Sequence, residues 1–155
     1  MKVMNIIHDS VVDGEGLRTT VIFAGCPHKC FGCHNPESWS ANNGREMTLE
    51  EIFEEIKGNP LADVTFSGGE PFEQIDNLVH LAKRIKNELN KNIWIYTGYT
   101  YEQILSHENL NFQKILEYCD VLIDGKFELD KRDLTLDFRG SSNQRVIDLN
   151  KLKEI

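Results

Sequence analysis

Short β-rich runs alternate along the chain with longer stretches in which apolar residues recur every three or four positions. The short runs stop at turn residues such as Gly25, Gly68 and Gly98, which is typical of strands. Five strands are predicted in this way, over residues 19–24, 63–67, 92–97, 121–127 and 145–149.

The longer stretches predict amphipathic helices. At residues 48–57, Thr48 and Glu51 form a capping box ahead of an apolar stripe, and Gly58 follows as a stop. A second helix is predicted over residues 72–89, and its apolar face consists of Phe72, Ile75, Leu78, Val79, Ala82, Ile85 and Leu89. A third begins with the capping pair Thr100 and Gln103, and a further stripe consists of Phe112, Ile115, Leu116 and Cys119.

This alternation of strands and helices predicts an α/β fold in which helices cover a mostly parallel sheet. A full eight-fold barrel usually needs about 250 residues. The chain has 155, so we expect a partial, open (β/α) barrel. Since no repeat, low-complexity tract or linker-like segment divides the sequence, we expect a single domain over residues 1–155.

Charge and hydropathy exclude two classes of partner. Lys and Arg number 17 and Asp and Glu 25, so the net charge is −8, whereas a nucleic-acid-binding protein would show a basic surplus or stripe. No apolar run approaches the ~18 residues that span a bilayer, and residues 1–5 lack the apolar stretch of a signal peptide. We therefore expect a cytoplasmic protein that binds neither nucleic acid nor membrane.

Three of the four cysteines, Cys26, Cys30 and Cys33, lie close together, and Cys119 is distant. A disulfide framework would need paired cysteines and an oxidising compartment, so the clustered thiols favour a metal. An iron–sulfur cube usually takes four cysteines. Three would leave one iron open to a substrate, as catalytic zinc sites keep one position open.

The alternative is a zinc-binding interaction module without catalysis, in which Cys119, His28 or His34 supplies a fourth ligand. Cys119 continues an apolar stripe, and cysteine that is not in a disulfide is often buried, so we expect it in the core. The two histidines could equally be polar loop residues.

Ligand sites in parallel sheets lie at the carboxyl ends of the strands. The unusual residues follow four predicted strands: the cysteine loop and residues 68–70, 97–99 and 124–126. We expect these segments to meet at one site. Each also has a plainer interpretation: Glu70 as a carboxylate at a helix N-terminus, residues 97–99 as a turn, and Asp124 with Lys126 as a solvated ion pair.

The motifs also carry a specific resemblance. The cysteine loop, CPHKCFGCHNPESW, resembles that of the radical S-adenosylmethionine (SAM) enzymes, and SGGEP at residues 67–71 matches their GGE motif. Residues 13–18, DGEGLR, resemble the DGPGxR element of glycyl-radical activating enzymes. The segments IWIYTGYTYEQI, DVLIDGKF and FRGSSNQR are similar to one subgroup of those enzymes, the anaerobic ribonucleoside-triphosphate reductase activating proteins. The resemblance covers essentially the whole chain.

The resemblance implies that Cys26, Cys30 and Cys33 ligate a [4Fe–4S] cluster whose open iron binds SAM. An electron from a reduced donor such as flavodoxin would cleave SAM, and the 5′-deoxyadenosyl radical would abstract hydrogen from a glycine of the reductase. No side chain is assigned a catalytic role of its own. The implied SAM contacts are Gly68, Gly69, Glu70, Thr97, Tyr99, Asp124, Lys126 and His34.

The chain departs from the family pattern at two positions. Gly32 stands where an aromatic residue usually precedes the third cysteine, so either Phe31 or His34 would lie beside the adenine. Glu15 replaces the proline of the DGPGxR element.

A pyruvate formate-lyase activating enzyme is the closest rival, because it shares the N-terminal motifs. It is normally longer, and the segments YTGYTYEQ and RGSSNQR argue against it. Because the target glycine lies in another protein, we expect a site that is open on one side, with the reductase docking over the open sheet edge.

Overall fold

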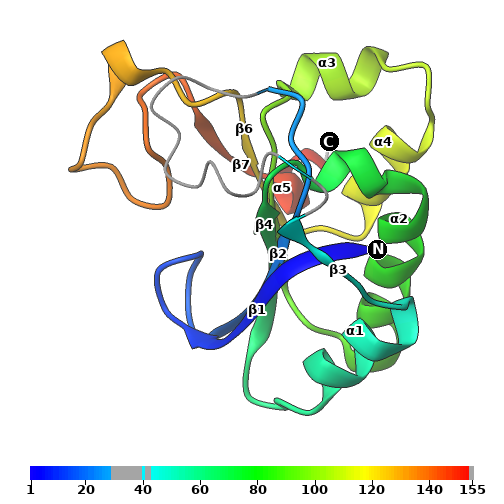
Figure 1. Cartoon of the computed structure of the whole chain (residues 1–155). Coiled ribbons are helices and arrows are strands. Elements are labelled where there is room, and N and C mark those ends of the chain that lie inside the picture. The colour runs from blue at the N-terminus through cyan, green and yellow to red at the C-terminus, as the bar shows by residue number, and fades with distance from the viewer. Residues whose placement is uncertain (29–39, 41–42, 154–155) are drawn as a thin grey trace.

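The computed structural model describes residues 1–28, 40 and 43–153, and its centre is one seven-stranded sheet in the order β3-β1-β2-β4-β5-β6-β7 (Figure 1). The strands are β1 (Lys2–Ser10), β2 (Arg18–Phe23), β3 (Arg45–Glu46), β4 (Asp63–Gly68), β5 (Ile93–Tyr96), β6 (Val121–Asp124) and β7 (Arg145–Asp148).

The centre of the sheet is parallel and its edges are antiparallel. β2, β4, β5 and β6 pair in parallel, whereas β1, β3 and β7 run against their neighbours. The expectation of a mostly parallel sheet is therefore confirmed for the centre and wrong at both edges. An antiparallel strand can follow its neighbour after a turn alone, whereas a parallel strand needs a crossover connection about as long as a helix.

The predicted helices are present, with adjusted limits. α1 (Leu49–Lys57) begins at the Thr48–Glu51 capping box, and α3 (Tyr101–Ser106) at the corresponding box of Thr100 and Gln103. The stretch predicted as one helix divides into a 3-10 turn, η3 (Pro71–Gln74), then α2 (Ile75–Arg84) and a π-helical turn, η4 (Ile85–Leu89). The remaining helical elements are α4 (Asn111–Lys114), η5 (Ile115–Glu117), η6 (Leu129–Lys131) and α5 (Leu149–Lys153).

Three details differ from the sequence-based expectation. The strand predicted over residues 121–127 ends at Asp124, and Cys119 follows the last helical turn instead of lying on it. The long strand β1 was not predicted. Its pairing with β2 shifts register twice, between Val3 and Asn5 and between Ile7 and Ser10, which breaks the two-residue period that marks a strand.

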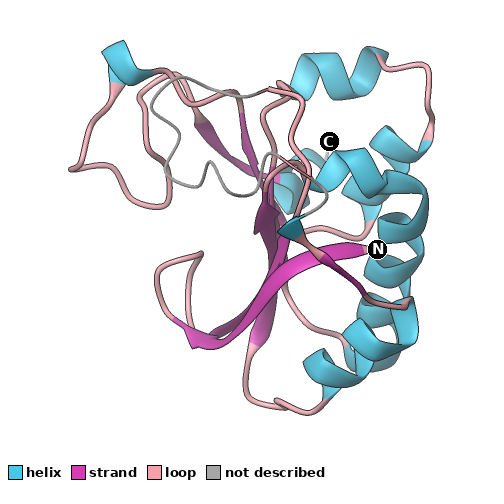
Figure 2. Ribbon diagram, in the orientation of Figure 1, coloured by secondary structure: helices cyan, strands magenta, loops and turns pink. Residues whose placement is uncertain are grey.

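Alternation along the parallel strands separates two faces of the sheet. One face is apolar and packs against α1, α2 and α4, which lie together on one side of the sheet in Figure 2. Its fully buried residues are Val21, Phe23, Val64, Phe66, Ile93, Ile95 and Leu122. The opposite face carries polar and aromatic side chains, among them Arg18, Thr65 and Trp94.

Among the residues that the structure describes, none of the helices has the length and apolar character needed to cross a membrane.

Candidate functional site

The carboxyl ends of β2, β4, β5 and β6 lie at one end of the sheet, which we call the carboxyl end, because these strands are parallel. Backbone hydrogen bonds join the segments that follow them. Glu70 N donates to Gly25 O over 2.7 Å, and Gly125 N donates to Tyr99 O over 3.0 Å. The structure therefore brings residues 68–70, 97–99 and 124–126 together with the start of the cysteine loop.

Glu70 is the most enclosed residue of this group, with no exposed surface. It caps η3, where Phe72 N donates to Oε2 over 3.0 Å, so the plainer expectation of a carboxylate at a helix start holds. Its carboxylate also accepts from Thr97 Oγ1 at 2.9 Å and from Gly98 N at 2.7 Å. The protein's own donors thus surround this charge, as a buried carboxylate requires.

His28, in the cysteine loop, supplies a further contact to the same carboxylate. Its Nε2 lies 2.7 Å from Glu70 Oε1, and its side chain is 7% exposed. The edge of the ring meets the half-buried ring of Tyr99, with centroids 4.8 Å apart. Burial, aided by the charge of Glu70, raises the pKa of Tyr99, so its phenol stays protonated. Sequence reasoning treated His28 as a loop residue or zinc ligand and missed this contact.

Asp124 pairs with Arg145 instead of Lys126. Asp124 is 1% exposed. Its carboxylate accepts hydrogen bonds from Arg145 Nε at 3.1 Å and from Tyr101 N at 2.8 Å. Arg145 also reaches Glu102 at 2.7 Å, and this hydrogen bond lowers the pKa of Glu102 to about 2. The solvated Asp124–Lys126 pair considered from the sequence is therefore absent from the described structure, and Lys126 is exposed.

An open pocket of about 660 Å³ lies at the carboxyl end of the sheet. That volume is typical of small-molecule sites. Its lining includes His28, Gly98, Asp124, Lys126 and Asn143. Asn143 Nδ2 donates to Lys126 O at 2.7 Å, while its Oδ1 is buried and lacks a partner in the described structure. A buried acceptor of this kind fits a ligand that donates a hydrogen bond.

The first cysteine of the loop, Cys26, follows β2 at the carboxyl end of the sheet and is half-buried. Cys30, Cys33 and His34 lie outside the described residues, as do Phe31 and Gly32. Within residues 1–28, 40 and 43–153, no group of three or more metal-binding side chains is present.

Cys119 lies at the opposite, amino end of the sheet, directly before β6 starts. It is fully buried in the hydrophobic core, as expected from the sequence. Burial raises the pKa of its thiol to about 12. The zinc site with Cys119 as fourth ligand is disfavoured by position, because Cys119 and Cys26 lie at opposite ends of the sheet.

Residues 13–18, the DGEGLR segment, also lie toward the amino end of the sheet, since Arg18 starts β2. Arg18 is 1% exposed, and its Nε donates to Thr65 Oγ1 at 2.7 Å. Gly14 has φ +142°, and a Cβ there would meet Arg18 Cδ at 2.8 Å. This segment therefore forms a packed turn against the polar face of the sheet.

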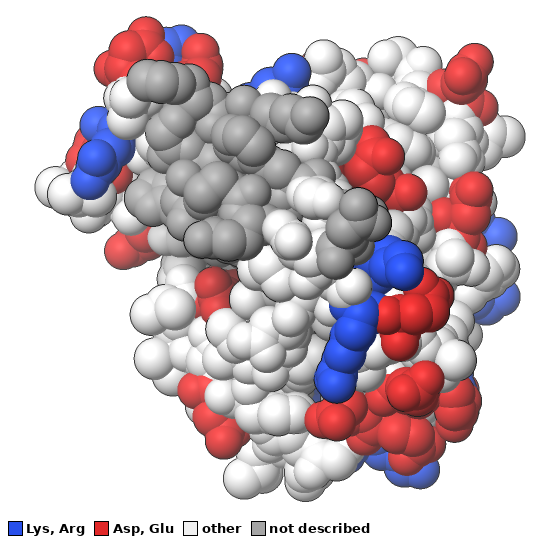
Figure 3. Space-filling model, viewed as in Figure 1, with Lys and Arg blue, Asp and Glu red and all other residues white. Residues whose placement is uncertain are grey.

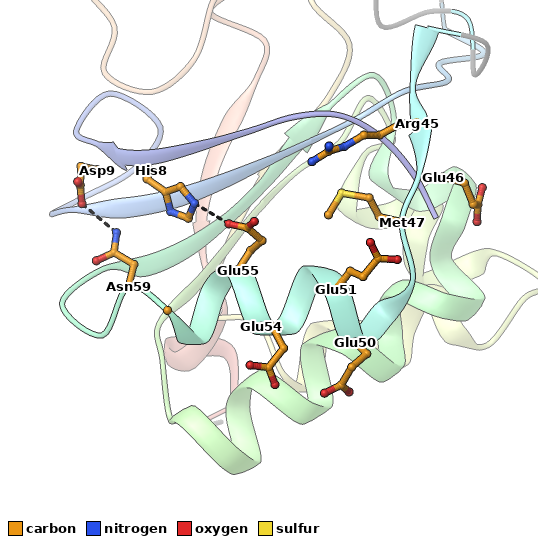
Figure 4. Close-up of a pocket in the computed structure, with 11 residues that line it drawn as sticks. His8, Asp9, Arg45, Glu46, Met47, Glu50, Glu51, Glu54, Glu55 and Asn59 are labelled. Carbon is orange, nitrogen blue, oxygen red and sulfur yellow. Dashed lines mark hydrogen bonds and ion pairs between the residues drawn. The ribbon is translucent and has the colours of Figure 1, made fainter.

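A second hollow, of about 900 Å³, lies along α1 and is lined by acidic side chains including Glu50, Glu51 and Glu54 (Figure 4). His8 Nε2 contacts Glu55 Oε2 there at 2.9 Å. Figure 3 shows the acidic side chains gathered on this side of the molecule. None of the predicted site residues that the structure describes lines this hollow.

Comparison with known proteins gives consistent relatives over most of the chain. The family described as "4Fe-4S single cluster domain" matches residues 12–147. An anaerobic ribonucleoside-triphosphate reductase-activating protein of Pasteurella multocida is 42% identical, over 88% of this chain and 90% of the relative. Proteins of the same name from phage T4 and Escherichia coli K12 are 38% and 33% identical, over 87% and 88% of this chain and 86% and 91% of the relatives.

The matched range, residues 12–147, includes the cysteine loop and the ends of the parallel strands, and three of the residues within it that line the pocket are His28, Gly98 and Asp124. The identity exceeds 30% along nearly all of both chains, and the matched domain is one that carries an iron–sulfur cluster. The chain therefore belongs to the family of anaerobic ribonucleoside-triphosphate reductase-activating proteins and contains a 4Fe-4S single cluster domain.

Proposed function

We propose that this protein activates an anaerobic ribonucleoside-triphosphate reductase by reductive cleavage of SAM at a [4Fe–4S] cluster. The observation that carries the proposal is the meeting of four strand ends at the carboxyl end of the sheet, where Cys26 follows β2 and a pocket is lined by His28, Gly98 and Asp124. Open α/β sheets bind ligands at this end. The names of the relatives supply the partner, the reductase.

In this proposal Cys26, Cys30 and Cys33 hold the cluster and leave one iron for SAM. The bound group would supply one electron to the sulfur–C5′ bond of SAM, giving methionine and a 5′-deoxyadenosyl radical that takes a hydrogen atom from a glycine of the reductase. A reduced protein such as flavodoxin provides that electron. A reducing cytoplasm keeps the thiols available for iron, and we place the protein there.

The chain's own residues bind and orient SAM. Gly68 and Gly69 let the backbone approach the methionine moiety. Because four donors of the protein already surround the carboxylate of Glu70, its part is to fix the adjoining strand ends. The further SAM contacts that we propose are Thr97, Tyr99, Asp124, Lys126 and His34.

Asn143 supports the fit of an organic ligand, since its unpartnered, buried Oδ1 can accept from a hydroxyl or amino group. Lys126 adds an exposed positive charge to the wall of the same pocket, which suits the carboxylate of SAM.

We further propose that the fold is a single, partial, open (β/α) barrel of the radical SAM type. One sheet takes strands from Lys2 to Asp148, and helices cover one of its faces. The polar face, with Arg18, Thr65 and Trp94, would be the inner wall. An open side of this barrel gives the reductase access to the pocket.

The test is anaerobic reconstitution with iron and sulfide, followed by dithionite and SAM. We expect a brown protein with about four irons per chain, release of 5′-deoxyadenosine, and a glycyl-radical EPR doublet when the reductase is added. Cys26→Ala, Cys30→Ala and Cys33→Ala should each abolish the cluster. A colourless protein with tightly bound zinc would support the interaction module instead. A doublet on pyruvate formate-lyase but not on the reductase would support the rival activating enzyme.

A further inference from the structure

His28 has a place in the site that none of the sequence motifs explains. It lies two residues after Cys26, its side chain is 7% exposed, and its contacts come from the segments that follow β4 and β5. Its Nε2 donates to Glu70 Oε1 at 2.7 Å, because a carboxylate can only accept. The edge of its ring packs against Tyr99. A polar loop residue with no role would be expected to face solvent.

Gly98 makes room for this imidazole. A Cβ built on Gly98 would lie 2.4 Å from His28 Cδ2 and 2.7 Å from Nε2, closer than real Cβ contacts. The φ angle of Gly98 lies outside the left-handed region, so the backbone itself does not require glycine there. Glycine at position 98 therefore leaves the space that the ring of His28 occupies.

The carboxylate of Glu70 also accepts hydrogen bonds from Gly98 N at 2.7 Å and from Thr97 Oγ1 at 2.9 Å. Glu70 thus joins three segments: the start of the cysteine loop, the GGE motif and the end of β5. His28 is the member of this network that the loop itself contributes. Groups that orient metal ligands without binding the metal commonly change affinity by about 10- to 100-fold when removed.

We propose that His28 is a positioning residue, which holds the start of the cysteine-bearing segment on Glu70 and Gly98 and so fixes where Cys26 presents its sulfur. The inference rests on the proposed iron–sulfur site. It concerns retention of the cluster and its geometry, and it does not require His28 to bind iron.

The experiment uses the full chain, reconstituted anaerobically, and measures the rate at which an iron chelator removes the cluster and the EPR spectrum of the reduced cluster. We expect His28→Ala to lose iron about 10- to 100-fold faster than the wild-type protein. His28→Gln keeps an N–H donor for Glu70 and loses the aromatic contact, so its rate should fall between the two. The EPR signal of His28→Ala should broaden as the cluster takes several geometries.

Gly98→Ala provides an independent approach from the other side of the contact. It should speed iron loss to a similar extent, because the new methyl group displaces the imidazole. In the double variant His28→Ala/Gly98→Ala the methyl group enters the space that the ring has left, so the two effects should not add. Additive rates in the double variant would overturn the proposal.

His107→Ala is the matched control, since His107 is also a packed histidine, stacked on Phe112 at 3.6 Å. It should lower Tm without changing the rate of iron loss. His28→Ala protein that loads four irons and releases them at the wild-type rate would overturn the inference alone. A wild-type chain that takes up no iron would overturn the proposed function and the inference with it.

Discussion

The buried guanidinium of Arg18 gives the sharpest prediction for stability. It is 1% exposed and donates to Thr65 Oγ1 at 2.7 Å, to Glu15 O at 2.6 Å and to Val64 O at 2.8 Å. Two further bonds reach Asn92, at O (3.0 Å) and at Oδ1 (2.8 Å). One side chain therefore joins the amino ends of β2, β4 and β5 to the turn that precedes β2.

Replacing Arg18 by alanine leaves these buried acceptors without a donor, at about 1–3 kcal/mol for each one that water cannot reach. Water can hydrate some of these acceptors in the space that the Arg18 side chain leaves, so the total cost is smaller than the sum over all of them. We expect Arg18→Ala to lower the free energy of unfolding by about 3–5 kcal/mol, which corresponds to about two buried acceptors that stay dry. For a chain of this length that corresponds to a fall in Tm of about 10 °C.

The measurement is urea unfolding of the apo chain, followed by circular dichroism. Arg18→Lys should recover part of the loss, because one ammonium group cannot reach all five acceptors. Arg84→Ala is the control: Arg84 bonds Glu50 and Glu88 on the surface and covers the ring of Phe53 at 3.8 Å, so its loss should cost no more than about 1 kcal/mol. If Arg18→Ala unfolded within about 1 kcal/mol of wild type, the role assigned to this network would be wrong.

Three further outcomes can be checked. Cys119→Ala should keep the full iron content and cost about 1 kcal/mol in urea unfolding, and the Cys119 thiol, with its pKa near 12, should resist alkylation at pH 8 until the chain unfolds. Gly68→Ala should cost about 3 kcal/mol, because φ is +133° and the new Cβ would lie 2.3 Å from Phe23 O; an unchanged Tm would refute this. The pKa of Glu102, lowered from 4.5 to about 2, means that its pairing with Arg145 stabilises the fold above pH 4.5 and is lost as pH falls through 2; NMR titration should find the low midpoint in wild type and its return toward 4.5 in Arg145→Met.

The fold could be predicted wherever local chemistry and burial pattern agree. The capping boxes at Thr48 and Thr100 located two helix starts to the residue, because the cap is a local hydrogen bond between side chain and backbone. β1 escaped prediction because its two register shifts remove the alternation of buried and exposed residues. The antiparallel direction of β7 was also missed, since no local pattern specifies strand direction.

Part of the candidate site could be predicted from the rule that ligand sites in parallel sheets lie at the carboxyl ends of the strands. That rule brought residues 68–70, 97–99 and 124–126 to one end of the sheet, where the structure has them. The partners within the site depend on tertiary packing. Arg145 reaches Asp124 because β7 returns antiparallel beside β6, and His28 reaches Glu70 across 42 positions of sequence.

The outermost strands of the sheet affect how this protein meets other chains. β3 consists only of Arg45 and Glu46, both exposed and charged, and the four-residue β7 has an exposed charge at each end. Long apolar edges attract further strands and lead to aggregation, whereas short charged edges discourage it. The two outermost strands, β3 and β7, thus discourage pairing with a strand of another molecule, which favours contact with a partner elsewhere, such as at the loops of the carboxyl end.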